Sequence, residues 1–259
     1  MQLADRIALV TGAGQGIGKA SALALAAAGA DVVAVDIDGP SAKQTASAIS
    51  AAGLRSLAVQ ADMGAVKDID RMVAEAMAAF GRIDILVNNA GITRRAYIMD
   101  LTEEDWDRIH RVNAKGVFFC LQRVAREMIP RRSGRIINIA SIAGKGFIGT
   151  SNAVYAASKG AVIALTKTAA QQLGQHDINV NAVCPGIVRT NLYLNMIATI
   201  AQREGVPVEQ IEQRYADTVP LKRANEPEDI AAMVVFLASP GARNITGQSF
   251  NVDGGLIPD

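Results

Sequence analysis

The sequence has little of several residue types, and each shortage excludes a class of protein. Its 26 lysines and arginines are balanced by 25 aspartates and glutamates, so the net charge of +1 argues against nucleic acid or an anionic membrane as the main partner. The two cysteines, Cys120 and Cys184, lie in apolar stretches, and we expect both to be reduced core residues. His110 and His176 have no partner at ligand spacing, and no Cys/His/Asp cluster indicates a metal site.

Long apolar runs are missing as well. No run approaches the ~20 residues that a membrane-spanning helix needs, and the polar residues 1–6 lead straight into a strand, which predicts no signal peptide. We therefore expect a cytoplasmic protein. Since 50% of the 259 residues are hydrophobic, the chain can form one large domain with a well-buried core.

Short β-branched runs alternate with alanine-rich stretches of helical pattern. Strands are predicted at residues 7–10, 32–35, 57–59, 83–87, 136–139, 178–183 and 249–252. Helices are predicted at residues 19–28, 42–51, 66–80, 112–128, 155–173 and 227–237. This alternation predicts βαβ units, and therefore a doubly wound parallel sheet of the Rossmann type with helices on both faces. We expect a single α/β domain over residues 1–259, with its ligand crevice at the carboxyl ends of the strands.

One segment interrupts this alternation after the sixth predicted strand. Residues 187–225 contain no strand pattern, but two short helices are predicted near residues 192–203 and 208–216. A long insertion at the end of a strand is more often a binding loop than a linker. We expect this segment to be a substrate lid within the domain.

A glycine-rich turn follows the first predicted strand and opens the first helix. It has the spacing Gly12-x-x-x-Gly16-x-Gly18, with Gln15 and Ile17 between the glycines. The strict G-x-G-x-x-G spacing is absent, because Ile17 stands at its third glycine position. Glycines at such a turn allow the backbone to approach a pyrophosphate at the helix N-terminus. The turn therefore predicts a dinucleotide site that includes all five residues.

Asp36 stands at the end of the second predicted strand. A carboxylate at this position can accept hydrogen bonds from the ribose hydroxyls of adenosine, and it repels a 2′-phosphate. Asp38 adds negative charge, and Gln15 and Ile37 occupy the places where a phosphate-binding cation is expected. The sequence therefore favours NAD over NADP.

Tyr155 and Lys159 are four residues apart in a predicted helix, so they share one helix face. A free phenol titrates near pH ~10 and is a poor acid or base at neutral pH. A neighbouring cation stabilises the phenolate. The pair therefore predicts a tyrosine whose pKa is lowered toward the range that is useful for proton transfer.

Taken together, six motifs resemble the short-chain dehydrogenase/reductase family over essentially the whole chain. They are Thr11-Gly12-x-x-x-Gly16-x-Gly18, Asn88-Asn89-Ala90-Gly91, Asn113, Ser141, Tyr155-x-x-x-Lys159 and Pro185-Gly186. The resemblance implies that Tyr155 exchanges a proton with the substrate oxygen and that Ser141 hydrogen-bonds that oxygen. It implies that Lys159 binds the nicotinamide ribose and that Asn113 holds a water molecule that relays protons.

The resemblance also implies further cofactor contacts. Asp62 and Met63 would contact the adenine, and Asn89, Ala90 and Gly91 would line the cofactor. Around the nicotinamide end, the implied residues are Pro185, Gly186, Ile187, Val188 and Thr190.

The substrate is less constrained by the sequence. The spacing from Ser141 to Tyr155 is fourteen positions, one more than is commonest in the family. Members that act on sugars and polyols vary in length here. The string Val219-Pro220-Leu221-Lys222-Arg223, with the long lid before it, resembles sugar-alcohol and acetoin-type dehydrogenases, which implies an NAD-dependent dehydrogenase of a polyol, a sugar or a small hydroxy-ketone. Arg94 and Arg95, at the rim of the expected crevice, are either solvated loop charges or ligands for an anionic substrate group.

Two alternatives stay open. A reductase of 3-oxoacyl thioesters on an acyl-carrier protein is one, although such enzymes commonly carry a basic residue where Gln15 stands. A non-catalytic NAD-binding regulator is the other, although Ser141, Tyr155 and Lys159 are all retained. The helices predicted to begin near residues 112 and 155 carry apolar residues on more than one face, so we expect a homotetramer.

Overall fold

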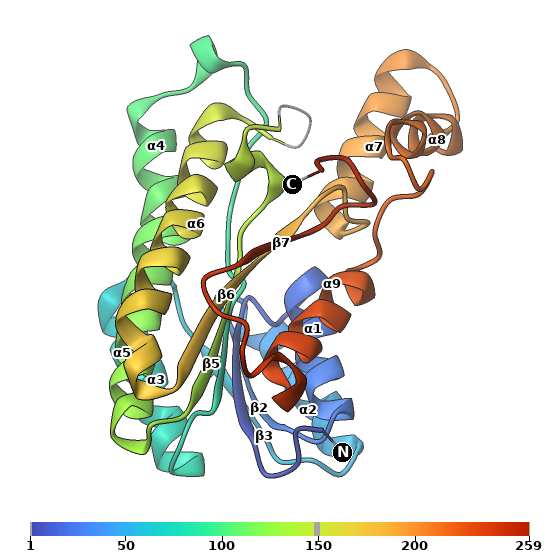
Figure 1. The fold of residues 1–259 in the computed structure, drawn as a ribbon. Coiled ribbons are helices and arrows are strands. Elements are labelled where there is room, and N and C mark those ends of the chain that lie inside the picture. The colour runs from blue at the N-terminus through green and yellow to red at the C-terminus, as the bar shows by residue number, and fades with distance from the viewer. Residues whose placement is uncertain (1, 148–150, 259) are drawn as a thin grey trace.

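The computed structural model describes residues 2–147 and 151–258, and its centre is a seven-stranded sheet (Figure 1). Neighbouring strands pair in parallel in the order β3-β2-β1-β4-β5-β6-β7. The strands are β1 Ile7–Thr11, β2 Asp31–Asp36, β3 Ser56–Gln60, β4 Ile85–Asn88, β5 Gly134–Ile139, β6 Ile178–Pro185 and β7 Ser249–Val252. The doubly wound parallel sheet and its seven predicted strands are therefore confirmed.

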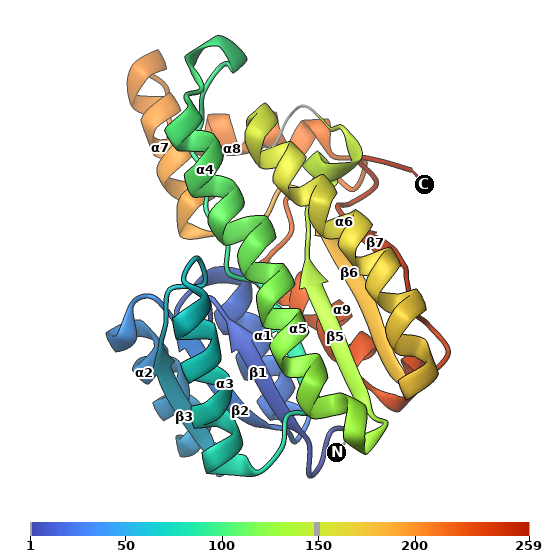
Figure 2. The same cartoon turned by 90° about the vertical axis from the view of Figure 1, so that its left-hand side faces the viewer.

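Helices cover both faces of the sheet (Figures 1 and 2). On one face lie α1 Gly16–Ala27, α2 Gly39–Ala51 and α9 Pro227–Ala238, and on the other lie α3 Val66–Phe80, α5 Val117–Met128 and α6 Ala153–Leu173. Side chains alternate along each strand. Val10 therefore packs beneath α1 and α9 while its neighbour Leu9 packs beneath α3 and α5, and both are fully buried.

The predicted helix at residues 112–128 is different in the structure. α4 Glu103–His110, which the sequence analysis did not single out, continues through a π-helix at Arg111–Gly116 into α5. The start of α4 is held by a capping box between Thr102 and Asp105. Single π turns inside helices are frequently found at functional sites.

The order of strands fixes where a ligand can bind. The chain fills the sheet in one direction from β1 to β3 and in the other from β4 to β7, so the connections diverge between β1 and β4. In open α/β sheets, ligands bind outside the carboxyl ends of the strands at such a switch point. The glycine turn follows β1, and Asn88-Asn89-Ala90-Gly91 lies at and beyond the end of β4, so both motifs meet there.

Residues 187–225 form a small helical unit beyond the carboxyl ends of the strands (Figure 1). It contains α7 Asn191–Glu204 and α8 Val208–Thr218, which share a hydrophobic cluster of their own built on Tyr193, Ile197 and Ile211. The segment leaves and rejoins the body at one point, since Val188 and Asn225 form a parallel β-bridge.

Two further expectations can be compared with the structure. Cys120 and Cys184 are both buried, and neither forms a disulfide within the described residues, as predicted. Among residues 2–147 and 151–258, no helix is both long and apolar enough to cross a membrane.

Candidate active site

The glycine turn is shaped by close backbone contacts. Gly12 has a φ of +65°, which favours glycine, and a Cβ there would lie 2.8 Å from the amide nitrogen of Asn89. A Cβ on Gly18 would lie 1.9 Å from the carbonyl oxygen of Gly12, so only glycine allows α1 to pack this closely on the turn. Gln15 provides no side-chain cap for α1 among the described residues, and the first turn of the helix lacks an acidic residue. The amide N–H groups there suit an anion such as a pyrophosphate.

Thr11 and Asn89 join the ends of β1 and β4. The Thr11 hydroxyl accepts hydrogen bonds from the backbone N–H groups of Asn89 at 3.0 Å and Ala90 at 3.1 Å. The Asn89 side chain donates to the carbonyl oxygens of Thr11 at 3.0 Å and Gly12 at 3.1 Å. The two predicted motifs are thus brought together, with the Asn89 side chain bonded to the turn itself.

Asp36 faces the glycine turn from the end of β2. Its carboxylate accepts hydrogen bonds from the backbone N–H groups of Gly14 at 2.8 Å and Asp38 at 3.0 Å. Asp38 in turn accepts a hydrogen bond from Ser41. In the described part of the chain, neither carboxylate makes a hydrogen bond or ion pair with a lysine or arginine. Among the described residues, this position therefore holds two carboxyl groups and no cationic partner for them.

Asp62 and Met63 lie next to Asp36, because the N–H of Ala61 donates to the Asp36 carbonyl at 2.9 Å. The Asp62 carboxylate accepts from the guanidinium of Arg111 at 2.9 Å and from the N–H of Gly64 at 2.8 Å. Met63 is buried. The structure therefore places the predicted adenine-contacting pair beside the end of β2, with the Asp62 side chain bound by Arg111 of the π-helix.

Asn113 lies in that π-helix and is fully buried. Its side chain accepts from the N–H of Ile92 at 2.8 Å and donates to the Ile92 carbonyl at 2.9 Å. It also donates to the hydroxyl of Ser158 at 3.1 Å. Asn113 therefore fixes the segment after β4 against α6, the helix that carries Tyr155 and Lys159.

Ser141 begins the short 3₁₀-helix Ile142–Lys145 that follows β5. Its hydroxyl accepts a hydrogen bond from the N–H of Ala143 at 3.1 Å, which caps this helix. The 3₁₀-helix packs directly on α6, since a Cβ on Gly144 would lie 2.6 Å from the backbone carbon of Lys159. This contact holds Ser141 beside the first turn of α6.

Lys159 is only 3% exposed, and its amine donates to the Ile139 carbonyl oxygen at 2.7 Å. The amine nitrogen lies 5.8 Å from the centre of the Tyr155 ring. A Cβ on Gly91 would lie 3.5 Å from this nitrogen and 3.4 Å from the side-chain oxygen of Asn113. The predicted residues from β4, the π-helix and α6 therefore converge around Gly91.

Burial governs the pKa values of the pair. Burial raises the pKa of the Tyr155 phenol to about 12, although the neighbouring Ser141 hydroxyl acts in the lowering direction. Burial also lowers the pKa of the Lys159 amine to about 8. The predicted lowering of the Tyr155 pKa by Lys159 is thus not found in this structure, because desolvation outweighs the effect of the neighbouring hydroxyl and the amine is directed at Ile139.

A second network holds the start of α6, and the sequence analysis missed it. Asn152 caps the helix by accepting from the N–H of Tyr155 at 2.8 Å, and its amide donates to the backbone carbonyl of Arg94. The Arg94 guanidinium binds both carboxylate oxygens of Asp105, at 2.6 and 2.8 Å, and this contact keeps the pKa of Asp105 well below its usual range. Arg94 is therefore a structural residue here, and the hypothesis that it binds a substrate anion is not supported. The asparagine that precedes the predicted helix was the available signal.

Arg95 lies on the other side of the same loop. It is exposed, and its guanidinium reaches the Tyr215 hydroxyl of α8 at 3.5 Å. Large apolar side chains are exposed on the loop after β4 and on α7: Tyr97, Ile98, Met99, Leu192 and Leu194. The loop after β4 and α7 therefore both present exposed apolar side chains.

The residues predicted around the nicotinamide follow the end of β6. Gly186 packs against Asp253, from which a Cβ would lie 2.7 Å away. Beyond Ile187 and Val188, Thr190 immediately precedes α7 and approaches Gly16, with 3.2 Å between its methyl group and a Cβ placed on Gly16. The amide of Asn191 donates to the side-chain oxygen of Gln15 at 3.1 Å. Pro185 and the residues after it therefore bring α7 over the glycine turn.

Comparison with known proteins agrees with this arrangement. Residues 12–257 match the family described as enoyl-(acyl carrier protein) reductase. The chain is 43% identical over 255 residues to the 3-oxoacyl-[acyl-carrier-protein] reductase FabG of Staphylococcus epidermidis, covering 97% of this chain and 99% of that protein. It is 41% identical over 259 residues to the sorbitol dehydrogenase of Cereibacter sphaeroides, covering 98% of each. The crystal structure of levodione reductase superimposes with a TM-score of 0.90 at 32% identity and covers 98% of each chain.

The chain belongs to the short-chain dehydrogenase/reductase family. The predicted resemblance is thus confirmed. This short-chain dehydrogenase/reductase is an oxidoreductase, and membership of the family implies a nicotinamide cofactor. The glycine turn fits such a group, because its close contacts leave only glycine at Gly12 and Gly18 and the start of α1 has amide donors for a pyrophosphate.

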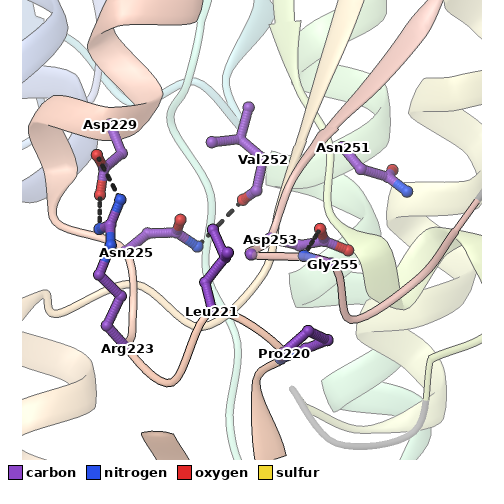
Figure 3. Close-up of a pocket in the computed structure, with 10 residues that line it drawn as sticks. Pro220, Leu221, Arg223, Asn225, Asp229, Asn251, Val252, Asp253 and Gly255 are labelled. Atoms are coloured by element: carbon purple, nitrogen blue, oxygen red, sulfur yellow. Dashed lines mark hydrogen bonds and ion pairs between the residues drawn. The ribbon is translucent and has the colours of Figure 1, made fainter.

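A pocket of about 540 Å³ lies where residues 219–225 return to the body of the protein (Figure 3). Asn225 donates to the Val252 carbonyl at 3.1 Å, and Arg223 forms an ion pair with Asp229 at 2.8 Å. None of the predicted site residues lines this pocket. Its polar contacts anchor the end of the helical segment to β7 and α9.

Proposed function

We propose that this protein is an NAD(H)-dependent oxidoreductase that interconverts a secondary alcohol and a ketone, with Tyr155 as the acid and base. The observation that carries the proposal is the position of a nearly fully buried lysine beside a tyrosine, with Ser141 close to the phenol. A buried, desolvated amine is costly to keep charged, and such groups occur preferentially at functional sites.

The residues divide the chemistry as follows. A nicotinamide cofactor held by the glycine turn at Gly12, Gly16 and Gly18 would supply the hydride chemistry at the carbon that bears the alcohol or ketone oxygen. Tyr155 accepts the proton of the alcohol oxygen in one direction and donates it in the other. Ser141 donates a hydrogen bond to the same oxygen, where negative charge develops. The Lys159 amine donates to the Ile139 carbonyl in this structure, so stabilisation of the phenolate by its charge stays a prediction.

Asn113 has a positioning role in this proposal. Both hydrogens of its amide and its oxygen are already bound to Ile92 and Ser158. The predicted water relay through Asn113 stays a prediction. The bonds connect Ile92, in the segment after β4, to α6, so they fix the position of this segment relative to the helix that carries Tyr155 and Lys159.

The proposed cofactor is NAD, because Asp36 and Asp38 are negative and no described cation contacts them. The 2′-phosphate of NADP would meet like charge in a partly desolvated cleft, which disfavours binding. We expect a preference for NAD of about 10²-fold or more in kcat/KM, and the double change Asp36→Ala with Ile37→Arg should reduce it. Equal kcat/KM with both cofactors in the unchanged enzyme would contradict the role of Asp36.

For the substrate, we propose a polyol, a sugar or a small hydroxy-ketone. The supporting observations are the similarity to a sorbitol dehydrogenase and the extended spacing between Ser141 and Tyr155. The second candidate is a 3-oxoacyl thioester, which is supported by the 3-oxoacyl-[acyl-carrier-protein] reductases among the relatives and by the exposed apolar residues at the rim of the crevice. In this candidate, Met99 and Leu192 would contact an acyl chain.

A panel of substrates separates these candidates. NADH absorbance is followed with polyols and sugars in the oxidative direction, and with hydroxy-ketones and a 3-oxoacyl thioester in the reductive direction. The proposal predicts turnover with polyols, sugars or hydroxy-ketones and little turnover with the thioester. Met99→Ser should leave the turnover of the polyol, sugar or hydroxy-ketone unchanged. Turnover confined to the thioester, and weakened by Met99→Ser, would support the second candidate and contradict the first.

We also propose that residues 187–225 act as a substrate lid and that the protein is a homotetramer. The lid is supported by the separate hydrophobic cluster of α7 and α8. Assembly is supported by Phe118 of α5, which is 41% exposed, and by Ala161 of α6, which is also exposed. Ala169 of α6, by contrast, is buried in the core of the subunit and is not part of the proposed interface.

The assembly proposal is tested by placing charge on the exposed face of α5. Phe118→Glu should lower the mass measured by light scattering, and Val208→Glu, an equally exposed apolar residue on α8, should not. An unchanged mass with Phe118→Glu, or a fully active monomer of the unchanged protein, would contradict the proposed interface.

A further inference from the structure

A hollow of about 620 Å³ lies at the amino ends of the strands, whereas Tyr155 lies near their carboxyl ends. It is bounded by the residues that begin β1, β4, β5 and β6 and by the loop after α9. Its charged and polar lining includes Arg6, Asp84, Arg135, Asp177, Arg243 and Asn244. A volume of this size suits a small organic ligand.

The negative charge of Asp84 is already neutralised by groups other than Arg6. Asp84 is 2% exposed, and Arg82 binds both of its carboxylate oxygens at 2.6 and 2.9 Å. Arg131 and the backbone N–H of Ile7 bind it as well. Arg6 contacts it only at 3.5 Å, so this guanidinium has donors left for another acceptor.

Arg135 is a partly buried guanidinium without a carboxylate partner. It donates to the backbone carbonyl of Gly134 at 2.9 Å, and no carboxylate of the described residues lies within ion-pair distance. Burial lowers the pKa of Arg135, which Asp177 opposes and Arg6 reinforces. A desolvated cation in this position is stabilised by any anion that enters the hollow.

Arg243 contributes a third guanidinium. It is exposed, and in the parts of the chain that the structure describes its side chain has no hydrogen-bond acceptor or carboxylate partner. With Asp84 neutralised by Arg82 and Arg131, three arginines face one carboxylate, Asp177. The lining of the hollow is therefore positive by about two charges.

We propose that this hollow is a second ligand site, in which Arg6, Arg135 and Arg243 bind the phosphate group of a small organic phosphate. A dianion matches the excess of two positive charges, and guanidinium forks match the oxygens of phosphate. Ser133 and Asn244 add neutral hydrogen-bonding groups to the lining. The site lies at the other end of the strands from the glycine turn, so its ligand does not compete with the cofactor.

Calorimetric titration with inorganic pyrophosphate tests the site. The protein is kept in saturating NADH, so that the cofactor turn is filled, and ionic strength is held constant with sodium chloride. Binding should be measurable, and Arg243→Gln and Arg135→Gln should each weaken it by at least about 10-fold, as expected for the loss of a charge-assisted hydrogen bond.

Arg126→Gln is the matched control, because it removes an exposed arginine on α5, away from the hollow. It should leave pyrophosphate binding unchanged. Arg243 is exposed and makes no described side-chain contact, so its variant keeps the test valid if Arg135→Gln does not fold. Absence of binding, or binding that Arg243→Gln weakens no more than Arg126→Gln does, would overturn the proposal.

Discussion

Two nearly fully buried charges lie at opposite ends of the sheet, and the protein treats them differently. Asp84, at the amino end of β4, is 2% exposed and is bound by Arg82, Arg131 and the N–H of Ile7. Lys159, beyond the carboxyl end of β5, is 3% exposed, and the described residues give its amine one hydrogen-bond acceptor, the Ile139 carbonyl. Asp84 is neutralised by partners of opposite sign. The buried amine of Lys159 has no carboxylate partner among the described residues.

The pKa values record the difference. The arginines and the Ile7 N–H lower the pKa of Asp84 despite its burial, so the folded state favours its charged form. Burial lowers the pKa of Lys159 to about 8, so the folded state disfavours its charged form. Groups held at such a cost are typical of functional sites, where stability is exchanged for activity. The comparison predicts that removing each charge changes stability in opposite directions.

The largest effect is expected from Asp84→Asn. This change leaves Arg82 and Arg131 beside a neutral group, and breaking a buried ion pair typically costs about 3–5 kcal/mol of unfolding free energy. Urea unfolding at neutral pH measures it. Glu75→Gln, which removes a surface partner of Arg71 on α3, is the control and should cost far less. Similar losses in the two variants would contradict the structural role of Asp84.

Lys159→Met should have the opposite sign. It replaces a buried charged amine by an apolar side chain of similar length, and the shift from 10.5 to about 8 in pKa corresponds to roughly 1–3 kcal/mol. We expect the variant to be more stable than the unchanged protein without added cofactor, and inactive. A variant that is less stable in urea unfolding would show that the amine is held by favourable interactions.

The same shift predicts a pH dependence of stability. The pKa of Lys159 is lower in the folded state than in the unfolded state, so the unfolded state binds more protons between pH ~8 and ~10.4. The contribution of Lys159 to stability should therefore increase as pH rises through this window. Unfolding free energies of the unchanged protein and of Lys159→Met should converge between pH 7.5 and pH 9.5, and a constant difference would contradict the lowered pKa.

A smaller effect is expected from Arg94, whose loop holds Asn152 at the start of α6. Arg94→Gln removes the bidentate contact to Asp105, which loosens the loop that carries the Asn152 partner. Because small displacements of a catalytic group are costly, kcat should fall roughly 10-fold with little change in KM. Arg95→Gln should not change kcat. A rise of KM alone in Arg94→Gln would indicate instead that this arginine binds substrate.

The fold could be predicted from the sequence because its signals are local. Runs such as residues 32–35 predict buried parallel strands by composition alone, and the glycine turn between a strand and a helix indicates the cofactor end. The π-helix that carries Asn113 could not be predicted, because it depends on the bonds of that side chain to Ile92 and Ser158. Helical spacing places Asn113 on a helix without indicating the extra residue in its turn.

The pKa shifts and side-chain pairings of the site were harder to predict than the identity of its residues. Spacing alone places Tyr155 and Lys159 on one helix face, and the structure has them close together. The sign of the Tyr155 pKa shift depends on how far the site is removed from water, which spacing does not show. Likewise, Arg94 and Asp105 are eleven residues apart in a stretch that also contains other acidic residues, so their pairing is visible only in the folded chain.

The most direct test of the account compares turnover and cofactor binding in Tyr155→Phe, on the substrate that the panel identifies. The change removes the hydroxyl and keeps the ring, so NADH fluorescence should show nearly unchanged binding of the cofactor. The rate should fall by at least ~10²-fold, the lower range for the loss of a general acid and base. Near-normal turnover with intact NADH binding would contradict the assignment of Tyr155 and with it the proposed mechanism.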